Sequence, residues 1–145
     1  MKVLVILGTA RDESNTISAV HELCPYSDFE LVDLRKLNIG QYNYSAQTTD
    51  DFIYVAQKMQ SSDVIVFATP VYWYSMSAGL KTLFDRLSDL LAELKPIGKS
   101  LAGKRTFLVA TGSEPGLPEG FEVPFRRTSE YFGMIYEKAF YKCVR

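Results

Sequence analysis

The sequence predicts a single α/β domain, residues 1–145, in which a parallel sheet of five strands is covered by helices on both faces. Short runs of aliphatic and β-branched residues recur along the chain, and segments with helical periodicity separate them. The length of 145 residues suits one domain. The chain is 47% hydrophobic and 23% charged, as in ordinary globular proteins, which excludes disorder as its overall state.

The first third of the chain predicts two strands and one helix. Residues 3–7 (VLVIL) are a continuous aliphatic run, too short for a signal peptide and typical of a central parallel strand buried on both faces. Residues 14–16 (Ser-Asn-Thr) offer caps for a short helix that ends near Pro25. Residues 29–34 alternate between apolar and polar side chains and predict the second strand. Residues 38–47 carry no charge and no clear period, so we expect a loop.

The middle of the chain predicts two helices around a third strand. Residues 49–51 (Thr-Asp-Asp) are expected to cap a helix whose apolar positions run with helical spacing from Phe52 to Met59. Residues 64–68 (VIVFA) predict a buried strand, and residues 69–76 a loop. Ser77 is expected to cap the longest helix, whose apolar stripe continues to Leu94 and which ends at residues 95–96 (Lys-Pro).

The last third predicts two strands and one helix. Residues 106–110 form the fourth strand, and the glycines and prolines of residues 112–124 indicate a loop. A helix over 125–131 is closed by Gly133, and residues 135–144 form the fifth strand. This order of elements favours a flavodoxin-like three-layer sandwich with strand order 2-1-3-4-5, whose ligands bind beyond the carboxyl ends of strands 1 and 3. The chain stops just after the fifth strand, so we expect the final helix to be absent.

Composition excludes several classes of function. The chain has 16 Lys and Arg residues and 17 Asp and Glu residues, so its net charge is −1. This charge does not indicate a basic surface for nucleic acid or a polybasic segment that binds membranes. No apolar stretch approaches the roughly 18 residues that a membrane-spanning helix needs. Cys24 and Cys143 are too far apart for a zinc or iron–sulfur spacing, and His21 is the single histidine, so no metal site is predicted. We expect reduced thiols and a cytoplasmic location.

Two of the segments that follow strands suggest a ligand. Residues 8–16 are rich in hydroxyl and amide groups and open a helix, where free N–H groups and the positive end of the dipole suit a phosphate. Simple helix capping by residues 14–16 explains this segment at least as well when it is taken alone. The segment lacks both the spaced glycines of a dinucleotide site and a Gly-Lys-Ser/Thr motif, so a monophosphate fits better than a triphosphate. Tyr72, Trp73 and Tyr74 are consecutive aromatics, one of which we expect to pack inward, and they suit a flat heteroaromatic ring. Together the two segments describe a nucleotide such as FMN.

Two motifs carry a resemblance to a known family. Residues 8–16, GT-x-R-x-x-SNT, are similar to the phosphate loop of NAD(P)H-dependent FMN reductases and the related iron–sulfur flavoproteins. Residues 69–86, TPVYW-x-S-x-x-A-x-LK-x-x-x-DR, resemble the second loop and following helix of that family and form the more specific motif. The resemblance extends from Met1 to about Gly112. It implies a flavodoxin-like fold, noncovalent FMN, and hydride transfer from NADH or NADPH. The sequence does not distinguish between these two donors.

The resemblance also implies site residues by position. The FMN phosphate would be held by Thr9, Arg11, Ser14, Asn15 and Thr16. The ring and ribityl chain would be lined by Pro70, Val71, Tyr72, Trp73 and Ser75, and the ring bordered by Thr111 and Gly112. Lys81, Asp85 and Arg86 are expected to be structural residues of the helix, with Lys81 and Asp85 as an i, i+4 pair. We assign no side chain as a proton-transfer catalyst, because the flavin carries the chemistry.

The sequence departs from the family pattern in four places. Residues 40–49 contain no cysteine, which excludes the cluster that the iron–sulfur relatives carry there. Asp12 and Glu13 should weaken phosphate binding unless they point away, and Ser77 stands where a proline is common. Without a final helix, one sheet face should be partly bare, and we expect a partner subunit to cover it in a homo-oligomer.

The leading functional prediction is an FMN-dependent NAD(P)H oxidoreductase that passes hydride to the flavin and on to a small acceptor such as a quinone, a nitro compound or free flavin. One alternative is a flavodoxin-like electron carrier, which the charge of −1 disfavours because such carriers tend to be strongly acidic. Another is a flavin-free interaction module, which Asp12, Glu13 and the missing helix would favour. A receiver domain is discounted, because residues 68–70 read Ala-Thr-Pro where it would need an aspartate.

Overall fold

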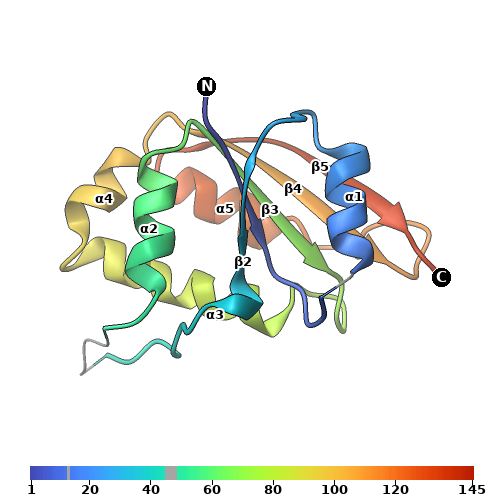
Figure 1. Cartoon of the computed structure of the whole chain (residues 1–145), viewed down its shortest axis with the longest axis horizontal. Helices are drawn as coiled ribbons and strands as arrows, with labels where there is room; N and C mark the ends of the chain where they lie inside the picture. Colours follow the sequence, from blue (N-terminus) through green and yellow to red (C-terminus); the bar gives the residue numbers. More distant parts are fainter. Residues whose placement is uncertain (13, 45–48) are drawn as a thin grey trace.

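The computed structural model describes residues 1–12, 14–44 and 49–145, and its five parallel strands form one sheet of order β2-β1-β3-β4-β5 (Figure 1). This confirms the predicted flavodoxin-like architecture. The strands are β1 (Val3–Leu7), β2 (Glu30–Asp33), β3 (Val64–Pro70), β4 (Arg105–Gly112) and β5 (Ile135–Cys143). The helices are α1 (Asn15–Leu23), α2 (Phe52–Gln60), α3 (Ala78–Arg86), α4 (Lys95–Ser100) and α5 (Val123–Tyr131), with short 3-10 helices η1 (Leu34–Lys36) and η2 (Leu87–Leu91).

The sheet has a core on each face. Successive side chains of a strand point to opposite faces, so Leu4 and Ile6 of β1 join the core under α2, α3, α4 and α5, whereas Val5 joins the core under α1. Every residue of β1 is buried, which explains why its sequence is a continuous aliphatic run rather than an alternating one.

The α1 side of β4 and β5 is covered by side chains where the fold would otherwise place a final helix. The Phe107 ring is 6% exposed, lies 6.3 Å from the stacked ring of Phe140 and meets Tyr26 edge-on at 5.8 Å. The ammonium of Lys138 lies 5.0 Å above the Phe140 ring, which stays half-buried. Among the described residues, no helix follows β5, and α1 is the one helix in the core on this face. Association through this face stays a prediction.

The single long helix predicted from Ser77 to Leu94 is wrong. Ser77 caps α3 as expected, with its Oγ accepting a hydrogen bond from the Leu80 N–H at 3.3 Å, but α3 ends at Arg86. The apolar stripe continues only because η2 buries Leu87 and Leu90 in turn. The proline expected to end that helix lies in the first turn of α4, where the missing N–H costs nothing because first-turn N–H groups have no intrahelical partner.

Candidate functional site

The carboxyl ends of β1, β3 and β4 surround a cavity of about 410 Å³. Such an edge is where ligands bind in open parallel sheets, because helices leave β1 and β3 toward opposite faces. The lining comes from three separate segments and the chain end: Thr9, Arg11, Ser14, Asn15, Thr16, Pro70, Val71, Tyr72, Thr111, Gly112, Ser113 and Val144. Of the residues predicted for the cofactor, all but Trp73 and Ser75 line this one cavity.

The start of α1 presents hydrogen-bond donors to the cavity. Ser14 caps the helix, since its Oγ accepts from the Ile17 N–H at 3.2 Å, so the capping interpretation is confirmed for that hydroxyl. The N–H groups of Asn15 and Thr16 have no acceptor within the described part of the chain. The Thr16 hydroxyl is 2.9 Å from that of Thr111, which ties α1 to the end of β4. Free N–H groups at the positive end of a helix, beside buried hydroxyls, fit a phosphate.

The charges around this segment also suit an anion. Arg11 lines the cavity, whereas Asp12 does not. The Asp12 carboxylate turns toward η1 and pairs with the Arg35 guanidinium at 2.8 Å. Asp12 therefore points away from the cavity with its charge paired, which removes one of the two objections that the sequence raised against phosphate binding. Glu13 lies outside the described residues.

Close packing around Gly112 shapes the other end of the cavity. The Val71 N–H donates to the Thr111 carbonyl at 2.7 Å and joins the second loop to the third. A Cβ at position 112 would lie 2.8 Å from the Tyr141 hydroxyl oxygen and 3.3 Å from the Val71 Cβ, so a side chain here would displace the Tyr141 hydroxyl from its present position. Burial, then the nearby Cys143 and Glu114 groups, raise the pKa of Tyr141, which keeps its hydroxyl protonated as a donor to the Glu114 carbonyl at 2.6 Å.

Sequence reasoning missed the contribution of β5 to this wall. Val144 follows the last strand and lines the cavity, and its N–H donates to the Gly112 carbonyl at 2.7 Å. The strand order was a usable signal, because a strand parallel to β4 must end beside the end of β4.

The consecutive aromatics form a tight hairpin turn. Tyr72 and Ser75 exchange two backbone hydrogen bonds, at 2.9 and 3.1 Å, and Trp73 and Tyr74 occupy the tip with φ of +49° and +70°. Positive φ at both central positions is typical of a type I′ turn, which usually takes glycine or asparagine. Exposed fractions of 42% for Tyr72, 92% for Trp73 and 66% for Tyr74 show that the expectation of one inward-packed ring is wrong. Bulky residues held in this strained conformation are typical of functional sites.

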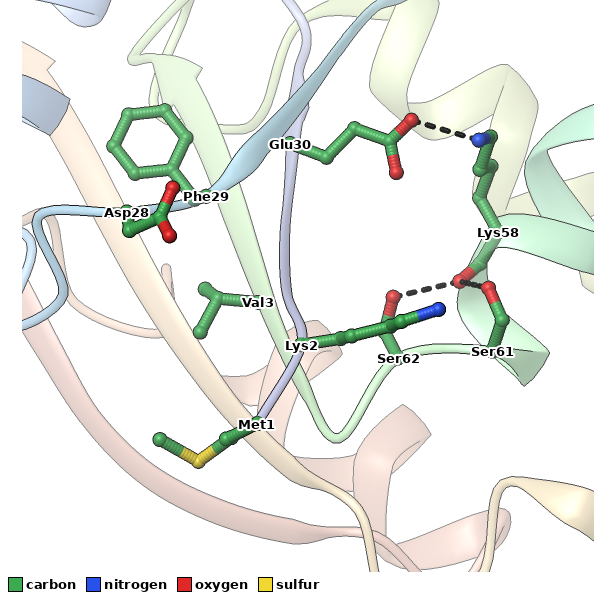
Figure 2. A pocket seen from close by; sticks show the side chains of 9 residues that line it. All are labelled: Met1, Lys2, Val3, Asp28, Phe29, Glu30, Lys58, Ser61 and Ser62. Atoms are coloured by element: carbon green, nitrogen blue, oxygen red, sulfur yellow. Dashed lines mark hydrogen bonds and ion pairs between the residues drawn. The ribbon is translucent and has the colours of Figure 1, made fainter.

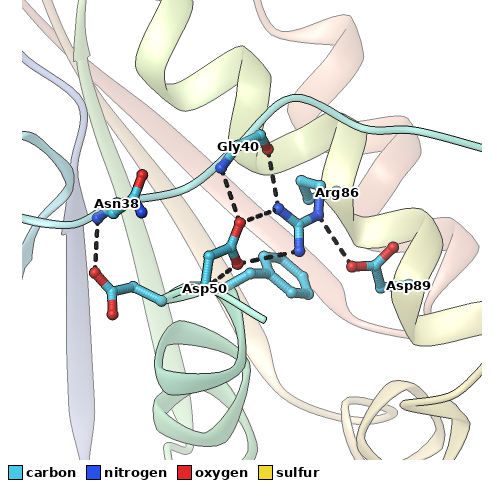
Figure 3. A network of polar contacts seen from close by, with 7 residues as sticks. Asn38, Gly40, Asp50, Arg86 and Asp89 are labelled. Carbon is cyan, nitrogen blue, oxygen red and sulfur yellow. Dashed lines mark hydrogen bonds and ion pairs between the residues drawn. The ribbon is translucent and has the colours of Figure 1, made fainter. Parts of the chain in front are cut away.

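A buried polar network lies outside the cavity and holds the loop that follows β2 (Figure 3). The Arg86 guanidinium, 5% exposed, donates to the Asp50 carboxylate at 2.7 Å, the Gly40 carbonyl at 2.9 Å and the Asp89 carboxylate at 3.0 Å. The Asp50 carboxylate also accepts from the Gly40 N–H at 2.9 Å. This confirms the structural role expected for Arg86, as the contact of Lys81 with Asp85 at 2.5 Å confirms the predicted i, i+4 pair.

A second hollow lies at the opposite end of the sheet (Figure 2), among Met1, Lys2, Val3, Asp28, Phe29, Glu30, Lys58, Ser61 and Ser62. Lys58 pairs there with Glu30 at 2.7 Å. This hollow lies at the amino ends of the strands, whereas ligands of open parallel sheets bind at the carboxyl ends. No helix in the described ranges could cross a membrane, and no cluster of three or more His, Cys, Asp or Glu residues in those ranges could hold a metal ion.

Comparison with known proteins agrees with this geometry. The model of the family described as NADPH-dependent FMN reductase matches residues 1–118. YwqN of Bacillus subtilis, described as an NAD(P)H-dependent FMN-containing oxidoreductase, is 26% identical over 148 residues, covering 94% of this chain and 82% of YwqN. An iron–sulfur flavoprotein of Methanocaldococcus jannaschii is 31% identical over 126 residues, covering 78% of this chain and 63% of that protein. The solved structure of RosB with bound 8-demethyl-8-formylriboflavin-5'-phosphate superposes with a TM-score of 0.82 at 20% identity, covering 99% of this chain and 65% of that one.

The family match includes the segment at the start of α1, the loop that follows β3 and the first part of the loop that follows β4. These segments supply one cavity with free N–H groups and hydroxyls, which suit a phosphate, and with an aromatic side chain, which suits a flat ring. A flavin nucleotide has both a phosphate and a flat ring. The chain therefore belongs to the family of NADPH-dependent FMN reductases, with FMN as its cofactor and NAD(P)H as its electron donor.

Proposed function

We propose that the cavity at the carboxyl edge holds FMN and that the protein passes two electrons from NAD(P)H to a small acceptor such as a quinone, a nitro compound or free flavin. The observation that carries this proposal is the convergence of the three predicted segments, from α1, β3 and β4, on one cavity of about 410 Å³. RosB, which shares this fold, is solved with a bound riboflavin-5'-phosphate derivative, and this supports a flavin nucleotide as the type of ligand.

Each end of the cavity would hold a different part of the cofactor. The N–H groups of Asn15 and Thr16, together with Arg11, would bind the phosphate. Val71 and Tyr72 would line the ring on one side, where the lining is apolar and aromatic.

Bound FMN supplies the redox chemistry, since it accepts hydride from the nicotinamide and returns two electrons to the acceptor. The protein's own share is binding, orientation and charge stabilisation. Among the described residues that line the cavity, none carries a carboxylate or an imidazole, and we assign none of them as a proton-transfer catalyst. The N–H of Ser113 lines the same cavity without an acceptor among the described residues, and it can stabilise negative charge on a bound ring.

Anaerobic spectroscopy tests the function. The purified protein is loaded with FMN, freed of excess, and mixed with NADH or NADPH. Flavin bands that bleach support the oxidoreductase and identify the donor. Bands that persist would indicate an electron carrier, and a protein that retains no flavin would indicate an interaction module.

A proline at position 15 tests the phosphate end. Asn15 is the first residue of α1 and Ser14 before it is extended, with φ −106° and ψ 155°, so Asn15→Pro removes one N–H without disturbing the helix. A hydrogen bond to a charged group contributes about 1.5–3 kcal/mol, so the Kd for FMN should rise roughly 10- to 100-fold. Asn15→Ala, which keeps the N–H, is the matched control. Equal FMN affinity in the proline variant and the control would place the phosphate elsewhere.

We further propose that the protein works in the cytoplasm and that a second copy covers the face of β5 around the half-buried Phe140. Light scattering at micromolar concentration tests the association, and a monomer would contradict it.

A further inference from the structure

A second groove, of about 380 Å³, adjoins the cofactor cavity and lies between Tyr74 and residues 114–119. The two hollows share both loops, because Tyr72 and Ser113 line the cofactor cavity while Tyr74 and Glu114 line the groove. The volume lies within the range of roughly 300–1,000 Å³ that small-molecule sites have. A molecule in this groove would therefore lie against the loops that border the ring of the cofactor.

The walls of the groove are held in place by contacts elsewhere in the protein. Leu117 packs against the hydrophobic core, and the Glu114 carbonyl accepts the Tyr141 hydroxyl at 2.6 Å. On the other side, the hydrogen bonds between Tyr72 and Ser75 fix the hairpin that carries Tyr74. A preformed groove of this kind binds a ligand without first having to order a loop.

The chemistry of the groove is apolar and aromatic with a negative rim. Tyr74 is 66% exposed and offers a ring for stacking, and Leu117 and two prolines supply apolar surface. The carboxylates of Glu114 and Glu119 are exposed, and neither forms an ion pair with a basic side chain of the described residues. Unpaired carboxylates beside an aromatic ring attract a flat cation and repel a flat anion.

We propose that Glu114 and Glu119 determine the charge class of the acceptor, so that the groove takes flat aromatic acceptors that are cationic in preference to anionic ones of the same shape. This inference rests on the proposed function, since it names the acceptor of the same site. For a quinone, one hydride from NAD(P)H and one proton from solvent give the hydroquinone and NAD(P)⁺, so electrons and protons balance.

Three naphthoquinones that share one ring system test the proposal: a neutral one, one with a sulfonate and one with a trimethylammonium group. For each carboxylate at contact distance, we expect kcat/KM for the cationic quinone to exceed that for the neutral one by on the order of fivefold, and that for the neutral one to exceed that for the anionic one by a similar factor. The ratio of the cationic to the anionic quinone should fall as salt is added. In the double variant Glu114→Gln/Glu119→Gln, the ratio should fall toward one. Glu93→Gln removes another exposed acid, which lines a different hollow, and it should leave the ratio unchanged.

Binding of the three naphthoquinones to the full chain without flavin gives a readout that is independent of turnover. Trp73 is the only tryptophan and stands between Tyr72 of the cofactor cavity and Tyr74 of the groove, so quenching of its fluorescence reports a quinone at either hollow. Dependence of the quenching on Glu114 and Glu119 assigns it to the groove. The cationic quinone should quench at lower concentration than the anionic one, and the double glutamine variant should lose that difference.

The outcomes separate the two proposals. If NAD(P)H reduces bound FMN but neither kcat/KM nor quenching depends on quinone charge, this inference is wrong and the proposed function stands. If no flavin binds but the charge-dependent quenching persists, the proposed function is wrong and the groove remains a site for flat cations.

Discussion

Replacing Asp50 by asparagine should destabilise the protein by an amount that the structure lets us estimate. The side chains of Asp50 and Arg86 are 2% and 5% exposed and share two contacts, at 2.7 and 3.2 Å. Removing one partner of such a buried ion pair costs about 3–5 kcal/mol, because the other charge is left without compensation. Asp89 would still contact the Arg86 Nε at 3.0 Å, so we expect the lower end, about 3 kcal/mol.

Urea and thermal unfolding followed by circular dichroism measure this effect. For a chain of this size, a loss of about 3 kcal/mol lowers the Tm by roughly 6–12 °C. Asp85→Asn is the matched control, because its carboxylate pairs with Lys81 at 2.5 Å but is 49% exposed, and an exposed i, i+4 pair contributes only about 0.3–0.5 kcal/mol. If Asp50→Asn costs no more than Asp85→Asn, the reasoning about burial is refuted.

The remaining predictions concern acid stability, the cavity wall and the hairpin. Burial alone would raise the pKa of Asp50, but hydrogen bonds from Arg86 and two backbone N–H groups outweigh it and hold that pKa below its ordinary value. Because the pKa of Asp50 is lower in the folded protein than its unfolded value of about 4, ionised Asp50 stabilises the fold at pH values above about 4. This stabilisation is lost as the pH falls through the pKa that Asp50 has in the folded protein. Urea midpoints should therefore drop more steeply below pH 4 in the wild type than in Asp50→Asn. Gly112→Ala should weaken FMN binding measured by flavin fluorescence, because its Cβ would lie 2.8 Å from the Tyr141 oxygen, and Tyr141→Phe should partly restore it; binding equal to wild type would contradict this. Trp73→Gly should change the free energy of unfolding by no more than about 1 kcal/mol, because glycine relieves the strain at φ +49°. Trp73→Ala should change turnover or FMN affinity, and if it changes neither, Trp73 is not part of the site.

The strands and the cofactor segments could be predicted because their signals are local. A strand buried on both faces must be apolar at every position, and residues 3–7 and 64–68 are. The segment at residues 8–16 carries its chemistry in adjacent residues, so its hydroxyls and its helix start could be recognised together, and the structure brings them to one cavity.

The features that escaped prediction depend on residues far apart in the chain. Asp50 fits the pattern of a first-turn acid, and nothing local shows that its carboxylate binds Arg86, 36 residues later. The break after Arg86 escaped prediction because η2 buries Leu87 and Leu90, as a continued α-helix would. The aromatic hairpin escaped because two bulky residues at positive φ contradict ordinary turn preferences.

The wall that β5 supplies to the cavity ties nucleotide binding to the completion of the sheet. β5 lies at the edge of the sheet and pairs with β4, Tyr141 packs against Gly112, and Val144 lines the cavity. The cavity therefore has its full wall only when the last strand is in place. A ligand that binds this complete form and not one with a detached edge strand stabilises the pairing of β5 by mass action.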